Sequence, residues 1–139
     1  MSYRIGSFNC LNFGMGSNKD TQMFANIILD GKFDIIALQE IKGVNALKRI
    51  LVVLGKDWDG EADNVVNDYA FIWNNRRIKL VETQTQYGLR TYRPRIYKQY
   101  KIDRSLGQTD IKREPYFARF TSKGTAGGLP FEIRIINAH

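Results

Sequence analysis

Residues 34–40, Asp34-Ile35-Ile36-Ala37-Leu38-Gln39-Glu40, are the most informative stretch of the sequence for the fold. Four consecutive apolar residues lie there between polar ends. The run is too short and too rich in β-branched residues for a helix, so we predict a strand that is buried on both faces.

The segments on either side of this strand alternate between strand and helix patterns. Residues 3–10 are predicted to form a first strand, and residues 20–29 a helix that Asp20 caps and Gly31 ends. Residues 44–54 place their apolar side chains on one helical stripe. The order strand, helix, strand, helix favours an α/β layer built on a sheet.

The second half of the chain shows strand patterns. Residues 69–73 and 78–83 flank the Asn-Asn-Arg-Arg sequence at 74–77, which predicts a hairpin because asparagine tolerates positive φ. Residues 116–121 and 131–137 form a second predicted pair, joined by a glycine-rich turn. The sequence therefore predicts a layered α/β protein.

Composition narrows the class of protein. A chain of 139 residues with 43% hydrophobic residues has enough apolar side chains for one domain, which we expect to span residues 1–139. One cysteine and one histidine exclude an internal disulfide, a multi-cysteine zinc site and a histidine cluster. Because neither an apolar membrane span nor a signal-peptide pattern occurs, we expect a cytoplasmic protein without membrane contact, with secretion as the alternative.

Positive charge is concentrated in the second half of the sequence. Residues 1–68 carry a net charge of −2, and residues 69–139 carry +9. Basic residues and tyrosines alternate in residues 90–113, including Arg93, Arg95 and Lys98, which we interpret as contacts to the phosphates of a nucleic acid. The alternative is a solvated surface segment whose tyrosines pack on the core.

Polar residues follow three predicted strands at their ends. The sequences are Ser7-Phe8-Asn9, Gln39-Glu40 and Asn137-Ala138-His139. Side chains that leave strand ends in such sheets meet at one edge, where ligands bind. Amide and carboxylate oxygens are ligands for Mg²⁺, Mn²⁺ or Ca²⁺ rather than zinc, and an imidazole can act as a general acid or base. Each residue also has an ordinary interpretation as a solvated or locally hydrogen-bonded turn residue.

Four short motifs, in order along the chain, resemble the endonuclease/exonuclease/phosphatase superfamily. They are Ile5-Gly6-Ser7-Phe8-Asn9 with Leu11-Asn12, the stretch 34–40, Arg113-Glu114-Pro115 with the following aromatic strand, and Asn137-Ala138-His139. The Arg-Glu-Pro triplet is most similar to the deoxyribonuclease I-like branch.

The resemblance implies a fold, a reaction and a set of site residues. Members have a four-layered α/β sandwich of two similar halves and cleave phosphate esters with Mg²⁺. By position, Asn9 and Glu40 would bind the metal, His139 would act with Glu40 as a catalytic residue, and Arg113 would contact phosphate. This chain matches the N-terminal half, so we expect a mostly antiparallel mixed sheet with helices on one face.

The sequence departs from the family in lacking the motifs of its second half. Neither Gly-Asp-x-Asn nor Ser-Asp-His occurs. We therefore expect one sheet with an exposed apolar face, which self-association or a missing C-terminal half would cover. The expected function is a metal-dependent phosphodiesterase acting on nucleic acid. The alternatives are a nucleic-acid-binding remnant without catalysis, and a phosphoesterase of the same family acting on a lipid or a small phosphate ester.

Overall fold

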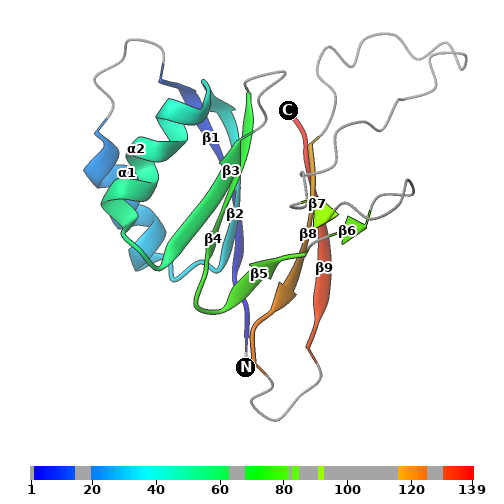
Figure 1. Ribbon diagram of the computed structural model, residues 1–139. Helices are drawn as coiled ribbons and strands as arrows, with labels where there is room; N and C mark the ends of the chain where they lie inside the picture. Colours follow the sequence, from blue (N-terminus) through cyan, green and yellow to red (C-terminus); the bar gives the residue numbers. More distant parts are fainter. Residues whose placement is uncertain are drawn as a thin grey trace, which may run out of the picture.

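The chain forms three layers in the order helices, sheet, sheet (Figure 1). The computed structural model describes residues 2–14, 20–62, 68–81, 83–84, 91–92, 116–124 and 130–139. Two helices lie on the outer face of a four-stranded sheet, and a three-stranded sheet faces its other side. Within these residues, no helix has the length and apolar character needed to cross a membrane. The α/β class predicted from the sequence is confirmed.

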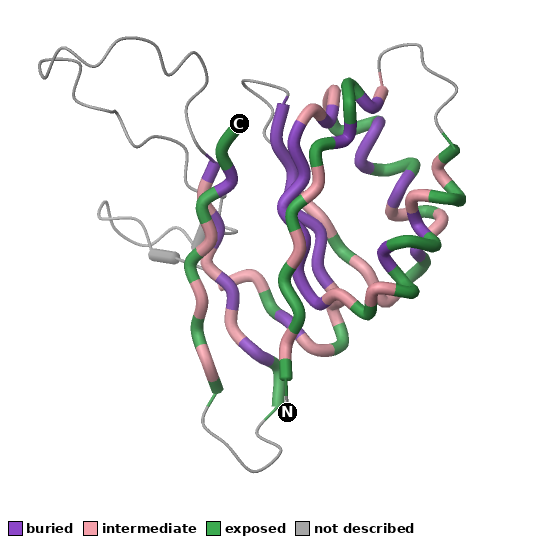
Figure 2. The backbone as a smooth tube through the Cα atoms, turned by 180° about the vertical axis from the view of Figure 1, so that it is seen from behind, coloured by how far each residue is buried: buried purple, intermediate pink, exposed green. Residues whose placement is uncertain are grey.

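The four-stranded sheet contains β1 (Ile5–Phe13), β2 (Ile35–Ile41), β3 (Trp58–Ala62) and β4 (Tyr69–Asn74), in the order β1-β2-β4-β3. β1 and β2 are parallel, whereas β4 runs antiparallel to both of its neighbours. The sheet is therefore mixed and mostly antiparallel, as expected. β2 and β4 occupy its centre and are buried along almost their whole length, as Figure 2 shows.

The two helices pack side by side on one face of this sheet. α1 (Thr21–Asp30) begins after Asp20, whose side chain accepts a hydrogen bond from the backbone of Met23 at 2.9 Å. α2 (Val44–Leu54) ends at Gly55, whose φ of 87° lies in the left-handed region that favours glycine. Both helices therefore begin and end close to the positions that the sequence predicts. Their buried contacts with the sheet involve Ala25, Ile28, Ile36, Leu38, Leu47, Ile50 and Ile72.

The second sheet is antiparallel and covers the inner face of the first. It contains β5 (Ile78–Leu80), β8 (Tyr116–Ser122) and β9 (Glu132–Asn137), in the order β5-β8-β9. The Phe71 and Phe120 rings meet between the sheets with centroids 5.8 Å apart. A short separate pair joins β6 (Thr83–Gln84) to β7 (Thr91–Tyr92). Apart from Thr83, the last residue of the predicted strand 78–83, these residues were not predicted to form strands.

This arrangement corrects two expectations. The prediction of one sheet with an exposed apolar face is wrong, because β5, β8 and β9 bury that face within the chain. The predicted hairpin of residues 69–73 and 78–83 is also wrong as a strand pair. β4 already has β2 and β3 on its two edges, so β5 cannot pair with it and instead pairs with β8 in the other layer.

The sequence analysis missed β3 altogether. Its sequence, Trp-Asp-Gly-Glu-Ala, alternates in polarity but is only five residues long, has no β-branched residue and has a glycine at its centre, so its strand pattern is weak. The strand forms because its backbone completes the free edge of β4, from Trp58 opposite Asn74 to Ala62 opposite Ala70. The second predicted strand pair, 116–121 with 131–137, is confirmed by β8 and β9.

Candidate active site

The candidate site begins at an irregularity in the pairing of β1 with β2. Between Asn9 and Phe13 the register shifts, so that three residues of β1 lie opposite Glu40 alone. Leu11, Asn12 and Glu40 all have φ between 50° and 59°, in the left-handed region that residues other than glycine rarely adopt. Backbone strain of this kind is concentrated at functional sites.

Hydrogen bonds within the irregular segment hold the Glu40 carboxylate at both oxygens. The Asn9 carboxamide donates to Oε1 at 3.0 Å, and the backbone N–H of Asn12 donates to Oε2 at 2.9 Å. The side-chain oxygen of Asn9 accepts in turn from the backbone N–H of Leu11 at 2.8 Å. The side chains of Asn9 and Glu40 are thus held in place by the irregular segment of β1.

These contacts also influence the ionisation of Glu40. The hydrogen bond from Asn9, and the weaker effects of the Asn12 N–H and the nearby His139, hold the pKa of the carboxyl below its ordinary value, while desolvation opposes them. The group is therefore a carboxylate at neutral pH and at mildly acidic pH. An ionised carboxylate is the form that a metal ion requires.

His139 lies just beyond the end of β9 and faces residues of the first sheet. Its Nε2 is 3.1 Å from Nδ2 of Asn9 and 3.3 Å from Oε1 of Glu40. Its Nδ1 lies 3.7 Å from Oδ2 of Asp68, and its backbone N–H donates to the Tyr69 hydroxyl at 3.2 Å. The imidazole therefore has a carboxylate near each ring nitrogen.

Asn9, Glu40, His139 and Asp68 form one polar cluster. The sequence analysis did not predict Asp68 as a member. Asp68 is only 1% exposed, and it forms an ion pair with the Lys42 ammonium at 2.6 Å. β4 runs antiparallel to β2, so the residue preceding β4 lies at the same end of the sheet as the residues that end β1 and β2. A polar residue directly before the apolar strand 69–73 was the available signal, but its relevance depends on the strand direction.

The oxygen ligands of the cluster suit a hard divalent cation. Mg²⁺ retains several water molecules and is commonly held by one or two carboxylates, of which Glu40 would supply one. The Asn9 carboxamide oxygen could also bind the metal if it gave up its hydrogen bond from the Leu11 N–H. Among the described residues, no group of three or more His, Cys, Asp and Glu side chains is placed to hold a metal by itself. The fit is therefore to a largely hydrated Mg²⁺ rather than to zinc, which needs three or four protein ligands.

The structure brings together three of the predicted site residues: Asn9, Glu40 and His139. The predicted phosphate-binding residues Arg93, Arg95, Lys98 and Arg113 lie outside the described residues. Neither a scan against protein-family models nor a search of curated proteins finds a match to this chain. The roles predicted for these residues therefore remain predictions.

Proposed function

We propose that this chain carries the metal-binding and histidine-bearing part of a divalent-metal-dependent phosphodiesterase of the endonuclease/exonuclease/phosphatase type. One observation carries the proposal. Asn9, Glu40, Asp68 and His139 come from sites up to 130 positions apart in the sequence and meet with polar atoms 3.0–3.7 Å apart. An amide, two carboxylates and an imidazole at one sheet end are the groups that metal-assisted phosphate ester hydrolysis uses.

Each residue has a role that follows from its contacts. Glu40 and Asn9 would hold Mg²⁺, with Mn²⁺ or Ca²⁺ as alternatives. When bound, such an ion neutralises charge on the phosphate. His139 would accept or deliver a proton at Nε2, and Asp68, 3.7 Å from Nδ1, would orient the ring. In this arrangement Nε2 is the nitrogen directed towards the substrate.

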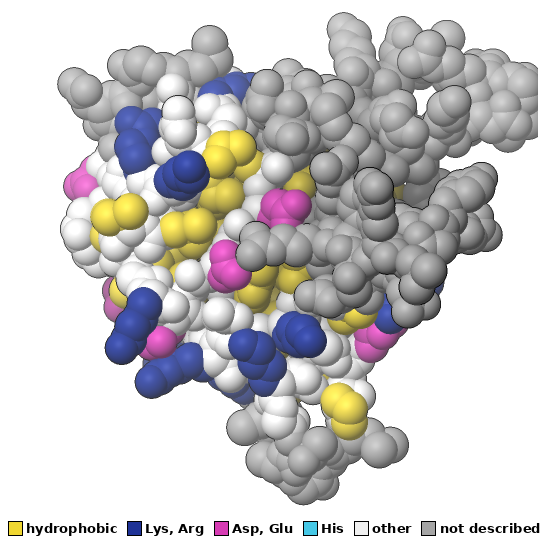
Figure 3. Space-filling model, in the orientation of Figure 1, with side chains coloured by type: hydrophobic (Ala, Val, Ile, Leu, Met, Phe, Trp, Pro, Cys, Tyr) yellow, Lys and Arg dark blue, Asp and Glu magenta, His cyan; other side chains and the backbone are white. Residues whose placement is uncertain are grey.

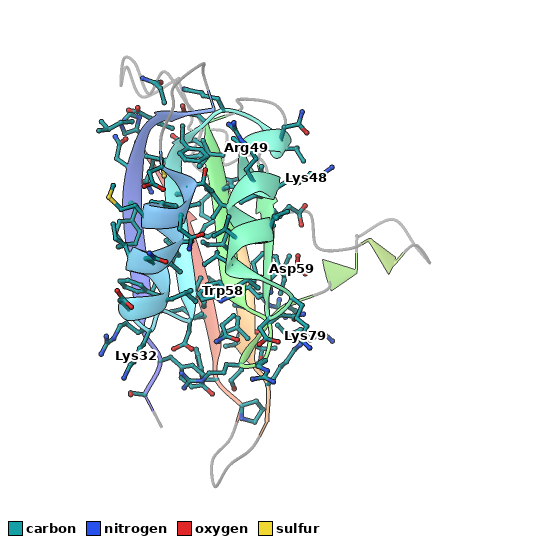
Figure 4. All side chains as sticks on the ribbon, turned by 90° about the vertical axis from the view of Figure 1, so that its left-hand side faces the viewer. Lys32, Lys48, Arg49, Trp58, Asp59 and Lys79 are labelled. Carbon is teal, nitrogen blue, oxygen red and sulfur yellow. The ribbon has the colours of Figure 1, made fainter. Side chains whose placement is uncertain are left out.

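The distribution of charge favours nucleic acid as the substrate. Residues 69–139 carry a net charge of +9. Lys42 directly follows β2 at the site, and Figure 4 shows Lys48 and Arg49 on α2 towards the same end of the molecule. In Figure 3, Lys and Arg side chains lie near the top of the described surface, the end where Figure 1 marks the C-terminus, and a second group lies along the lower edge, at the opposite end. A polyanion longer than a single phosphate ester could contact several of the cations near the site at once.

Cleavage assays test the proposal directly. Supercoiled plasmid and labelled RNA are incubated with the purified chain in Mg²⁺, in Mn²⁺ and in chelator. We expect metal-dependent cleavage that Glu40→Ala abolishes. The control is Asp59→Ala, which should leave cleavage unchanged, because Asp59 is an exposed residue of β3 opposite Trp73, at the far end of the sheet. Cleavage that survives both chelator and Glu40→Ala would contradict the proposal.

Nucleic-acid binding without turnover is the second candidate, and the +9 charge of the second half favours it. Its signature in the same samples is salt-sensitive binding without cleavage, weakened when Arg93, Arg95 and Lys98 are neutralised together. Metal-dependent hydrolysis of a small phosphodiester, with plasmid and RNA left intact, would redirect the proposal to lipid or small phosphate ester substrates.

A further inference from the structure

A group of buried polar side chains lies directly beneath the candidate site. Gln39 precedes Glu40 in β2, and Asn137 precedes His139 by two residues at the end of β9. Ser7 is the third member and comes from β1. Gln39 is 7% exposed and Asn137 is 1% exposed, so neither serves as a solvated surface residue.

Asn137 uses its whole carboxamide in bonds to the first sheet. Its Nδ2 donates to the backbone oxygen of Leu38 at 2.9 Å and to that of Ala70 at 3.1 Å. Its Oδ1 accepts from Nε2 of Gln39 at 2.6 Å. One side chain of the second sheet is thus bonded to two adjacent strands of the first sheet, β2 and β4.

Gln39 connects this group to β1. Its Nε2 also lies 3.1 Å from the Ser7 hydroxyl. The sequence analysis placed Ser7, Gln39 and Asn137 beside the predicted metal and catalytic residues but assigned them no role. Their hydrogen bonds join the three strands that carry Asn9, Glu40 and His139.

These bonds are directional, whereas the buried side chains packed between the two sheets, such as Phe71 and Phe120, form a largely apolar cluster. Apolar packing holds the two sheets together, but because it is non-directional it does not define the position of one strand along its neighbour in the other sheet. A buried carboxamide has three partners at fixed positions, and displacement leaves its polar groups unpaired, which is costly. Asn137 therefore defines where the end of β9 lies relative to β2 and β4.

We propose that Asn137 and Gln39 are positioning residues that hold His139 against Asn9 and Glu40. The pair acts through the placement of β9 and does not touch the substrate. Its consequence for catalysis rests on the proposed function, but the placement itself can be measured without any activity.

The test uses the single histidine of the chain, which makes the imidazole NMR signals unambiguous. In the wild-type protein we expect a nuclear Overhauser contact between the His139 ring and the Asn9 carboxamide protons, because Nε2 and Nδ2 are 3.1 Å apart. The variants are Asn137→Ala, which removes all three bonds, and Gln39→Met, which removes the bonds of Gln39 while keeping its volume.

The matched control is Ser122→Ala. Ser122 is also a buried polar residue of the second sheet, and its hydroxyl accepts from the backbone N–H of Phe131 at 3.1 Å at the end of the sheet away from His139. A general loss of stability would affect all three variants in the same way. A positioning role predicts a local change in the first two only.

We expect the His139–Asn9 contact to be lost in Asn137→Ala and in Gln39→Met and retained in Ser122→Ala. If Asn137→Ala does not fold, Gln39→Met decides the question. Retention of the contact in folded Gln39→Met, or its equal loss in Ser122→Ala, would overturn the proposal. A chain that shows these contacts but cleaves no phosphate ester would refute the proposed function and leave the positioning role intact.

Discussion

Two buried aspartates lie at opposite ends of the central sheet. Asp34 precedes β2 and Asp68 precedes β4, which runs in the opposite direction. Each is 1% exposed, and each forms an ion pair, Asp34 with Arg77 at 2.8 Å and Asp68 with Lys42 at 2.6 Å. The same residue type, equally buried and equally paired, thus occurs in two different settings.

The two aspartates differ in the group that lies next to Oδ2, the carboxylate oxygen that is not in the ion pair. At Asp34, Oδ2 accepts the backbone N–H of Arg4 at 2.8 Å, and Arg77 also donates to the Ser2 carbonyl and lies over the Tyr3 ring. These contacts tie the N-terminal segment to the sheet.

At Asp68, Oδ2 faces the His139 imidazole at 3.7 Å, and that imidazole is itself exposed and next to Glu40. The first carboxylate thus joins parts of the fold, whereas the second lies beside a residue of the candidate site. Burial and ion pairing alone are the same for both aspartates, so the proposed role of Asp68 depends on its neighbour His139.

The largest expected difference between the two ends is in activity. We expect Asp68→Asn to lower the rate of metal-dependent cleavage by about 10²–10⁴, the contribution typical of a positioned general acid or base, because Asn cannot stabilise the imidazolium of His139. The measurement is the cleavage rate per folded molecule. A rate within twofold of the wild type would show that Asp68 is only a structural partner of Lys42.

The second prediction concerns stability at the other end. Asp34→Asn should lower the free energy of unfolding by about 2–3 kcal/mol, less than for a fully buried pair because Arg77 remains 33% exposed and can be rehydrated. Urea unfolding measures this change, and cleavage per folded molecule should be unaffected. If Asp34→Asn reduced activity as strongly as Asp68→Asn, the distinction between the two ends would fail.

The smallest expected effect is a shift in ionisation. The bond from Asn9 lowers the pKa of Glu40, so the carboxylate favours the folded state above the ordinary glutamate pKa, and this contribution is lost as the pH falls through the lowered pKa. Asn9→Ala should raise the pKa of Glu40, which a ¹³C NMR titration of its side-chain carboxyl detects. An unchanged midpoint would mean that the other contacts of Glu40 control its ionisation.

Local patterns predicted the elements whose own residues favour them. The helix after Asp20 and the strand predicted from the apolar run after Asp34 follow from capping and from a continuous apolar sequence, and both are confirmed as α1 and β2. β3 and the layer to which β5 belongs could not be predicted in this way. Both depend on which edge of β4 is available, and that is decided by pairing between distant segments.

The candidate site divides in the same way. Asn9, Glu40 and His139 could be identified from the sequence because each is a polar residue at the end of an apolar strand and belongs to a motif. Asp68 belongs to no motif and was found only from the direction of β4. The hydrogen bonds of Asn137 to Leu38 and Ala70 likewise could not be predicted, because they form only when the second sheet packs on the first.

The sequence by itself determined the α/β class, the two helices, the buried central strand and the polar residues at three strand ends. These properties depend on side-chain polarity and backbone preference within about ten residues, which a single segment contains. Only the tertiary structure decided that the later strands form a second sheet over the first, and that His139 meets Glu40 and Asp68. Those contacts join residues that are far apart in the sequence, and their geometry arises only when the apolar faces of both sheets are buried together.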